Sequence, residues 1–182
     1  MPAKEVVITD RLGARLILSL KPGMSVALVG LDGTGKSTAV EMLETALIQA
    51  NVAVKTFHWY SAHKTCFLVP LTVLRNRWSK NAVQIFDRSI YDNFAVWLQR
   101  VPNEALRDRL MWLAVRTAQV LYPRFDALVH LTGLPDTIHV RRPEMTPTQI
   151  ARGQQVYTVL GGLLGARTLD TITVEGVDKV AV

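Results

Sequence analysis

Cysteine is almost absent from this sequence of 182 residues, and its scarcity is the first constraint on the protein. The single cysteine, Cys66, has no partner within the chain, so an internal disulfide is excluded. Small domains that depend on several disulfides are therefore ruled out, and a reducing compartment is favoured. We expect a cytoplasmic protein.

Long uncharged runs are also missing. The longest one lies between Arg152 and Arg167 and has 14 residues, whereas a membrane-spanning helix needs about 20. Near the start of the chain, Glu5 stands where a secretory signal would carry apolar residues, so no export signal is expected. The sequence therefore predicts no membrane partner.

Acidic side chains are fewer than basic ones, with 15 Asp and Glu against 21 Lys and Arg, which gives a formal net charge of +6. The excess is carried by 14 Arg and only seven Lys. This balance suits nucleic acid, and it equally suits small phosphorylated ligands, which guanidinium groups can bind through two parallel hydrogen bonds. The charge alone does not decide between these partners.

The rest of the composition is that of a globular protein, because 49% of the residues are apolar and 20% are charged. The length fits a single domain, residues 1–182. Short apolar runs alternate with longer helical patterns, which favours a mostly parallel α/β sheet with helices on both faces. We expect strands at 25–29, 52–57, 82–86, 126–131 and 171–175, helices at 36–50, 62–78, 89–100, 103–121, 135–141 and 149–164, and an antiparallel hairpin at 4–9 and 14–20.

Two of these helices carry further expectations. Pro70 lies inside the apolar pattern of residues 62–78, so we expect a broken helix or two short ones there. Residues 110–115 are apolar on every face. The helix that contains them should therefore be buried, either in the core of the domain, which we favour, or against another subunit.

Residues 30–37, Gly-Leu-Asp-Gly-Thr-Gly-Lys-Ser, have the spacing of a phosphate-binding loop and lie between a predicted buried strand and a predicted helix. Glycines let consecutive backbone N–H groups surround a phosphate, and the N-terminus of the helix adds partial positive charge. Lys36 would reach the outer phosphates and Ser37 would ligate Mg²⁺. The pattern therefore predicts binding of a nucleoside triphosphate.

The loop does not choose a reaction, because kinases, GTPases, transporter ATPases and nucleic-acid motors share it. The sequence contains neither the Asn-Lys-x-Asp element of guanine-specific GTPases nor the Leu-Ser-Gly-Gly-Gln signature of transporter ATPases. Small-molecule kinases remain.

The chain resembles the thymidylate kinase-like branch of the P-loop nucleoside and nucleotide kinases. Asp32 inside the loop, the Asp-Arg pair at residues 87–88 and the arginine-bearing segment 135–153 match that family's motifs in order and spacing, and residues 154–157 match the helix that follows. The match covers roughly residues 25–175. It implies a P-loop NTPase three-layer sandwich with about five mostly parallel strands, preceded here by the hairpin in residues 1–20.

The resemblance also implies roles for individual residues. ATP would be held by Gly30, Asp32, Gly33, Thr34, Gly35, Lys36, Ser37 and Thr38, and Mg²⁺ by Ser37 and, through water, Asp87. The catalytic cations would be Lys36, Arg88 and the lid arginines Arg141, Arg142 and Arg152. Structural alternatives stay open for several of them: Asp32 or Asp87 as a helix cap, Arg88 in an internal ion pair, and the lid arginines as solvated surface.

The residues expected to contact the acceptor depart from the family. Where thymidylate kinases carry an Arg-Glu-Pro element, this chain has His58, Trp59 and Tyr60, and after the Asp-Arg pair it has Tyr91 and Asp92. With Asp32 and Arg88, these residues form the predicted acceptor site. The aromatic ones could equally pack in the core.

The sequence thus predicts ATP- and Mg²⁺-dependent phosphoryl transfer to a small acceptor, and a nucleoside monophosphate or a related phosphorylated metabolite is the favoured acceptor. The alternatives are a sugar-like or other non-nucleotide acceptor, and a non-catalytic nucleotide-binding switch that acts on a protein partner. Nucleic acid is disfavoured as a partner, and a homodimer is left open.

Overall fold

The computed structural model describes residues 3–10, 12–58, 62–170 and 172–174, the side chains of 62–67 and 172–174 excepted. Its centre is a parallel sheet in the order β4-β5-β3-β6-β7. The strands are β3 (Ser25–Val29), β4 (Val54–Phe57), β5 (Val83–Phe86), β6 (Ala127–Thr132) and β7 (Arg167–Asp170). All five residues of β3 are buried, as expected for an apolar strand in the middle of a sheet that is covered on both faces.

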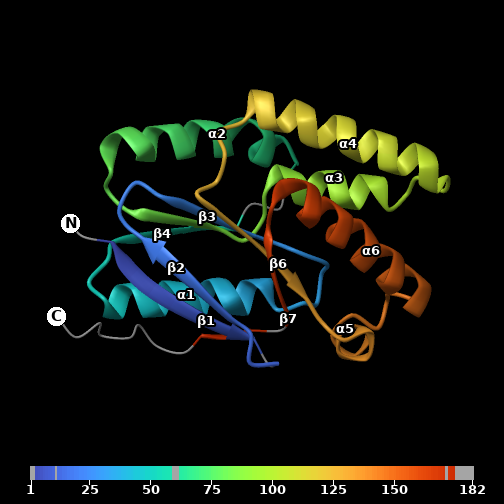
Figure 1. Cartoon of the computed structure of the whole chain (residues 1–182), viewed down its shortest axis with the longest axis horizontal. Helices are drawn as coiled ribbons and strands as arrows, with labels where there is room; N and C mark the ends of the chain where they lie inside the picture. The colour runs from blue at the N-terminus through green and yellow to red at the C-terminus, as the bar shows by residue number, and fades with distance from the viewer. Residues whose placement is uncertain (1–2, 11, 59–61, 171, 175–182) are drawn as a thin grey trace.

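The helices cover both faces of this sheet, so the predicted α/β sandwich is confirmed. Figure 1 shows α1 (Lys36–Gln49) on one side and α2 (Ala62–Ser79), α3 (Ile90–Leu98) and α4 (Glu104–Leu121) on the other. A short helix, α5 (Pro135–Arg141), leads into α6 (Pro147–Leu164), which packs against α3 and α4. Because all neighbouring strands of this sheet pair in parallel, the loops that follow the strands lie at the same end of the sheet.

A second, smaller sheet packs against α1. The predicted hairpin is present as β1 (Lys4–Asp10) and β2 (Arg15–Leu20), which pair antiparallel. The last described strand, β8 (Ile172–Val174), pairs with the other edge of β1 and gives the order β2-β1-β8. Buried side chains of the hairpin, including Val6, Ile8 and Leu20, belong to the same core cluster as Leu43 and Leu47 of α1.

The prediction of the last strand needs correction. Residues 171–175 were expected to be the fifth strand of the parallel sheet, but that strand is β7, which precedes them, and β8 belongs to the antiparallel sheet. The chain changes sheets near Asp170, whose backbone N–H donates to Asp10 Oδ2 at 3.3 Å. The apolar pattern marks a strand here, but it does not say which sheet the strand joins.

The expected break at Pro70 is also wrong, because α2 is continuous through it. Proline in a helix interior removes one backbone hydrogen bond, at a cost of about 3 kcal/mol. Val69 and Val73 on either side of Pro70 are buried and cluster with Phe86 of the sheet. Packing against the sheet therefore holds the helix together across the proline.

The third correction concerns α4, which is not buried on every face. Met111 and Val115 are buried together with Ala118, whereas Trp112 and Leu113 are 53% and 56% exposed. Only one side of the helix faces the core, so the favoured expectation of a fully enclosed core helix fails for the outer side. None of the helices in the described ranges is both long and apolar enough to cross a membrane.

Candidate active site

The phosphate-loop pattern folds as expected, between the end of β3 and the start of α1. Gly30 has no room for a side chain, because a Cβ atom there would lie 2.3 Å from the backbone oxygen of Leu131 on β6. Gly35 stands at the N-terminus of α1 with a φ of 89°, a left-handed conformation that favours glycine. No described side chain caps this helix N-terminus, so Asp32 is not its cap. The cap considered for Asp87 belongs to the helix expected at 89–100, and there Ser89 caps α3 instead.

The lysine of the loop is turned back onto the loop itself. Lys36 is 5% exposed, and its Nζ donates to the backbone oxygens of Gly30 and Leu31, the latter at 3.0 Å. Asp32 lies 3.6 Å away. Burial lowers the pKa of Lys36, while the nearby carboxylates of Asp92 and Asp32 act in the opposite direction. The ammonium group is thus held at the centre of the loop.

Ser37 and Asp87 meet across two strand ends. The Ser37 hydroxyl donates to Asp87 Oδ2 at 2.8 Å, and His58 Nδ1 lies 3.0 Å from the same oxygen. Asp87 is 1% exposed, and its other oxygen, Oδ1, has no hydrogen-bond partner among the described residues. A buried carboxylate oxygen with no partner, beside a serine hydroxyl, is an all-oxygen donor set of the kind that Mg²⁺ prefers. These two residues therefore fit the predicted metal.

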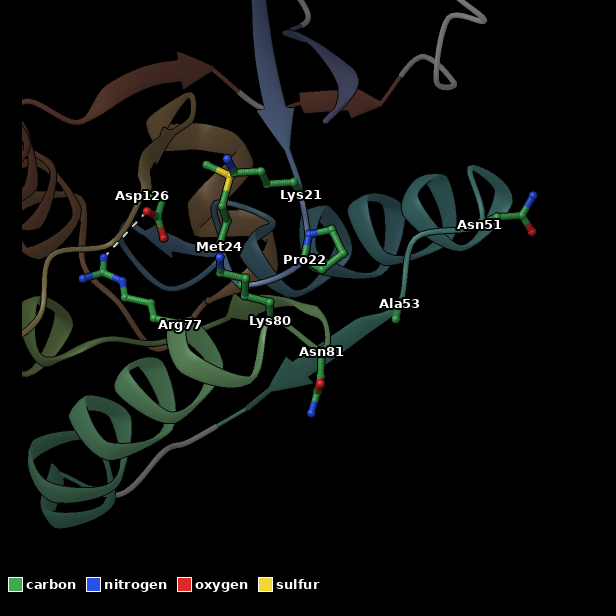
Figure 2. A pocket seen from close by; sticks show the side chains of 10 residues that line it. Lys21, Pro22, Met24, Asn51, Ala53, Arg77, Lys80, Asn81 and Asp126 are labelled. Carbon is green, nitrogen blue, oxygen red and sulfur yellow. Dashed lines mark ion pairs between the residues drawn. The ribbon is translucent and has the colours of Figure 1, made fainter. Parts of the chain in front are cut away.

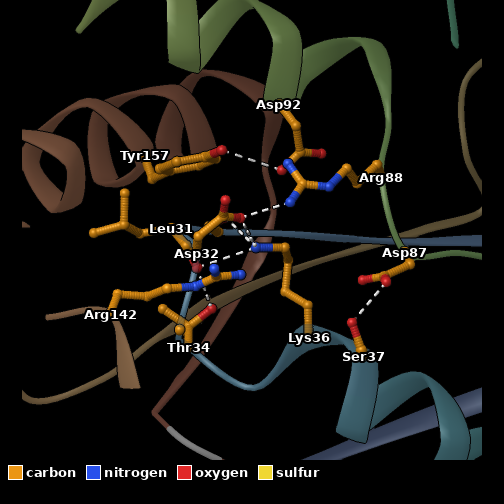
Figure 3. A network of polar contacts seen from close by, with 12 residues as sticks. Leu31, Asp32, Thr34, Lys36, Ser37, Asp87, Arg88, Asp92, Arg142 and Tyr157 are labelled. Carbon is orange, nitrogen blue, oxygen red and sulfur yellow. Dashed lines mark hydrogen bonds and ion pairs between the residues drawn. The ribbon is translucent and has the colours of Figure 1, made fainter. Parts of the chain in front are cut away.

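Arg88 forms an ion pair with Asp32 of the loop, with 2.7 Å between Arg88 Nη2 and Asp32 Oδ1. Burial alone would raise the pKa of Asp32, but Lys36, Arg88 and Arg142 together outweigh it and hold the pKa below its ordinary value. The internal ion pair considered for Arg88 is thus present, and it lies inside the cleft. Figure 3 shows it beside the Lys36 ammonium group.

Next to this pair lies a buried polar cluster that contains Asp92. The Asp92 Oδ2 atom accepts from the backbone N–H of Ser89 at 2.9 Å and completes the capping box of α3. Tyr157 of α6 donates its hydroxyl to Asp92 Oδ1 at 3.2 Å (Figure 3). Burial raises the pKa of Asp92, and Lys36 acts against that rise.

Tyr91 is 5% exposed, and its ring packs edge-on against Phe125. Neither Tyr91 nor Asp92 lines the cleft in this structure. Direct contact of either residue with an acceptor therefore stays a prediction.

The lid arginines are placed differently from one another. Arg141, at the end of α5, donates to the backbone oxygen of Gly33 at 3.1 Å, and Arg142 follows with its guanidinium 3.5 Å from Glu144. Arg152 points elsewhere and donates to the backbone oxygen of Val101. The structure brings the first two to the phosphate loop, and the lid role of Arg152 stays a prediction.

These groups surround a cleft of about 270 Å³ at the carboxyl ends of β3 and β5. Four cations and two carboxylates face it, which makes the cleft electropositive. Its lining consists of Asp32, Gly33, Gly35, Lys36, Ser37, Thr38, Asp87, Arg88, Arg141 and Arg142. Of the predicted loop residues, Gly30 and Thr34 shape the loop from inside, and Thr34 Oγ1 donates to the Leu31 oxygen at 2.8 Å. Trp59 and Tyr60 lie outside the described residues.

Two features of the site were missed at the level of sequence. The contact of His58 with Asp87 follows from the register of β4 against β5, which pairs Phe57 with Phe86 and so places the next two residues side by side. The cap formed by Ser89 and Asp92 could have been found, because a serine followed three residues later by an acidic residue is a known start signal for a helix.

No protein-family model matches the chain, and no curated protein matches it. Among solved structures, deoxyadenosine kinase from M. mycoides aligns over 81% of this chain and 89% of that one. Its complex with dATP gives 16% identity and a TM-score of 0.49. The complex with dCTP gives 15% and 0.49, and the one with the products dCMP and a flexible dCDP gives 13% and 0.48. Because identities this low say nothing by themselves about substrate, the function must be argued from the site's own residues.

Proposed function

We propose that the protein is a kinase that transfers the γ-phosphoryl group of ATP, with Mg²⁺, to a small acceptor, a nucleoside monophosphate or a related phosphorylated metabolite. The observation that carries the proposal is the pairing of Ser37 with the buried carboxylate of Asp87, directly beside Lys36 and the free helix N-terminus of the phosphate loop. Phosphoryl transfer requires this combination of metal-holding oxygens and fixed cations.

The residues of the loop would bind the triphosphate. Lys36 would exchange the backbone oxygens of Gly30 and Leu31 for phosphate oxygens, which carry more negative charge. Arg141 and Arg142 approach from the lid side and would neutralise charge on the group in transfer. Ser37 and, through water, Asp87 would hold Mg²⁺, which would neutralise negative charge on the phosphates.

The acceptor would bind on the side of Arg88 and Asp32. Arg88 lines the cleft beside Asp32, and its planar guanidinium group matches the geometry of an acceptor phosphate. The carboxylate of Asp32 stays ionised because its pKa is lowered, and an ionised carboxylate accepts a hydrogen bond from a sugar hydroxyl. A phosphorylated acceptor that also carries hydroxyl groups matches both residues.

The test is the formation of ADP from ATP in the presence of Mg²⁺ and a panel of nucleoside monophosphates, nucleosides and sugar phosphates. We expect little ADP without an acceptor and a strong rise with one class, accompanied by the phosphorylated acceptor in the mass spectrum. Tight binding of ATP with no acceptor-dependent ADP would contradict the proposal and favour a nucleotide-dependent switch.

A matched pair of lysine variants links this activity to the cleft. Lys36→Ala should lower kcat by at least about 100-fold, because it removes a cation that stabilises the transition state. Lys55→Ala, an exposed lysine on β4 that does not line the cleft, should leave kcat unchanged. Equal rates in both variants would reject the assigned site.

A further inference from the structure

A second cavity, of about 630 Å³, lies at the edge of the sheet opposite the phosphate loop. It is bordered by the turn that connects β2 to β3 and by the end of α2 (Figure 2). The whole of β3 separates this cavity from the phosphate loop, because the strand starts beside the cavity and ends at Val29, directly before Gly30. The cavity is therefore distinct from the cleft described above, and it has the size of a small-molecule site.

Three cations and a single carboxylate line this cavity, namely Lys21, Arg77, Lys80 and Asp126. The carboxylate is already engaged: Asp126 Oδ2 accepts from the backbone N–H and the hydroxyl of Ser25 at 2.8 and 2.9 Å, and Oδ1 lies 3.7 Å from Arg77. Within the described ranges, neither Lys21 nor Lys80 has a hydrogen bond or ion pair through its ammonium group. The cavity thus carries an uncompensated excess of two positive charges.

The two lysines line the same cavity. Figure 2 shows both side chains extending toward the side of the ion pair between Arg77 and Asp126, with Met24 between their ammonium groups. Like charges that line one cavity repel one another, and an anion bound between them would offset that repulsion. The arrangement is not needed to pair Asp126, since Arg77 already does so.

The backbone of Lys80 adds an independent observation. Lys80 directly follows the last residue of α2 and has a φ of 49°, which lies in the left-handed region. When the residue after a helix adopts this conformation, it is usually glycine. Its stem also fills the space in front of Gly23, where a Cβ atom would lie 3.2 Å from Lys80 Cγ. A lysine here strains the backbone, and a glycine would not, so the side chain is not there to stabilise the end of the helix.

We propose that this cavity binds a small soluble molecule through a phosphoryl group, held by Lys21, Arg77 and Lys80. A phosphate dianion would balance the two excess charges, and its oxygens suit both the guanidinium fork and the ammonium groups. The proposal does not depend on the function of the cleft, because it uses none of the cleft's residues.

The test is a titration of the wild-type protein with inorganic phosphate, followed residue by residue by amide NMR. We expect saturable shifts at residues 21–24 and 80–81, separate from any shifts at residues 30–37. Lys80→Gly should weaken this binding on the order of tenfold, since it removes one charge-assisted hydrogen bond. The same variant should keep or raise Tm, because glycine relieves the left-handed backbone. Lys4→Ala, an exposed lysine on β1, is the control that should change neither value.

Several outcomes would overturn the proposal. One is unchanged phosphate affinity in Lys80→Gly, and another is a set of shifts confined to the phosphate loop. Binding only to phosphatidylglycerol vesicles or to nucleic acid, without binding of soluble phosphate, would also reject a small soluble ligand. Lys21→Ala provides a second variant with the same expected loss of affinity, so a folding defect in Lys80→Gly would not leave the question undecided.

Discussion

At the scale of single residues, the cleft is built from groups that hold one another in place before any ligand is considered. Lys36 bonds the loop, Asp32 bonds Arg88, and Ser37 bonds Asp87. Each of these contacts keeps a charged or polar side chain in position in the absence of a ligand. A ligand that enters the cleft would therefore compete with protein partners, so the affinity for phosphate at this site reflects an exchange of hydrogen bonds rather than their creation.

His130 gives a prediction at the same scale. It lies on β6, is 2% exposed and stacks on Tyr157 with ring centroids 6.1 Å apart. Burial, with a smaller contribution from Lys36, lowers its pKa from 6.5 to about 4. Between these two pH values His130 is protonated in the unfolded chain but neutral in the folded protein. The free energy of unfolding therefore falls as the pH falls from about 6.5 to about 4.

The loss attributable to this histidine should reach about 2–3 kcal/mol, at roughly 1.4 kcal/mol for each unit of pKa. Urea unfolding of the wild type and of His130→Asn between pH 7 and pH 4.5 measures it. The variant should show a shallower decline with falling pH than the wild type. Parallel curves for the two proteins would contradict the assignment.

The sequence predicted the phosphate loop well, because the pattern is local and each position has its own physical requirement. It predicted that Ser37 and Asp87 act together, but it did not predict that His58 contacts Asp87. His58 stands 29 positions earlier, and only the pairing of β4 with β5 brings the two together. For Asp92 the local pattern was sufficient: Ser89 followed three residues later by an acidic residue predicts a helix start, whereas the family resemblance implied a place in the acceptor site.

At the scale of elements, the apolar sequence of α4 predicted a helix but did not predict which of its sides is buried. Its inner side carries Met111, Val115 and Ala118 and faces the helices around it, while its outer side carries Leu113 and Val120, which are 56% and 83% exposed. An apolar run therefore predicts that a helix forms, but it does not predict which residues of that helix contact the core. The same holds for α2, where burial of Val69 and Val73 outweighs a proline that local rules treat as a break.

A pair of alanine variants tests this two-sided character of α4. Met111→Ala should cost about 2–5 kcal/mol of unfolding free energy, because it leaves a cavity in the core. Leu113→Ala on the outer side should cost less than about 0.5 kcal/mol. Chemical unfolding at low and high protein concentration measures both. If the loss of unfolding free energy in Leu113→Ala grows with protein concentration, a second copy of the chain covers this side. That result would support the alternative expectation from the sequence, burial against another subunit.

At the scale of the whole molecule, the hairpin is part of the main core and not a detachable addition. Ile8 on β1 is fully buried among residues of α1 and the parallel sheet, whereas Ile17 on β2 is 57% exposed. The sequence predicted the hairpin itself from its alternating pattern and turn. It could not predict that the hairpin shares a core with α1, since that depends on contacts across long stretches of chain.

Matched substitutions in the hairpin measure this integration. Ile8→Ala should lower the global unfolding free energy by about 2–5 kcal/mol, while Ile17→Ala should change it by less than about 1 kcal/mol. Thermal unfolding followed by both circular dichroism and hydrogen exchange distinguishes global from local effects. Loss of protection confined to residues 4–20, with the rest of the protein unchanged, would mean that the hairpin unfolds on its own.

The pairing of β1 with β8 has a consequence for biosynthesis. A ribosome delivers β1 among the first residues of this sequence and β8 only after every strand of the parallel sheet has been made. During translation, one edge of β1 is therefore unpaired until β8 has been made, and an unpaired strand edge can pair with another chain and cause aggregation. The parallel sheet and its phosphate loop can therefore form before β8 pairs with β1, so the antiparallel sheet would be completed after the parallel one.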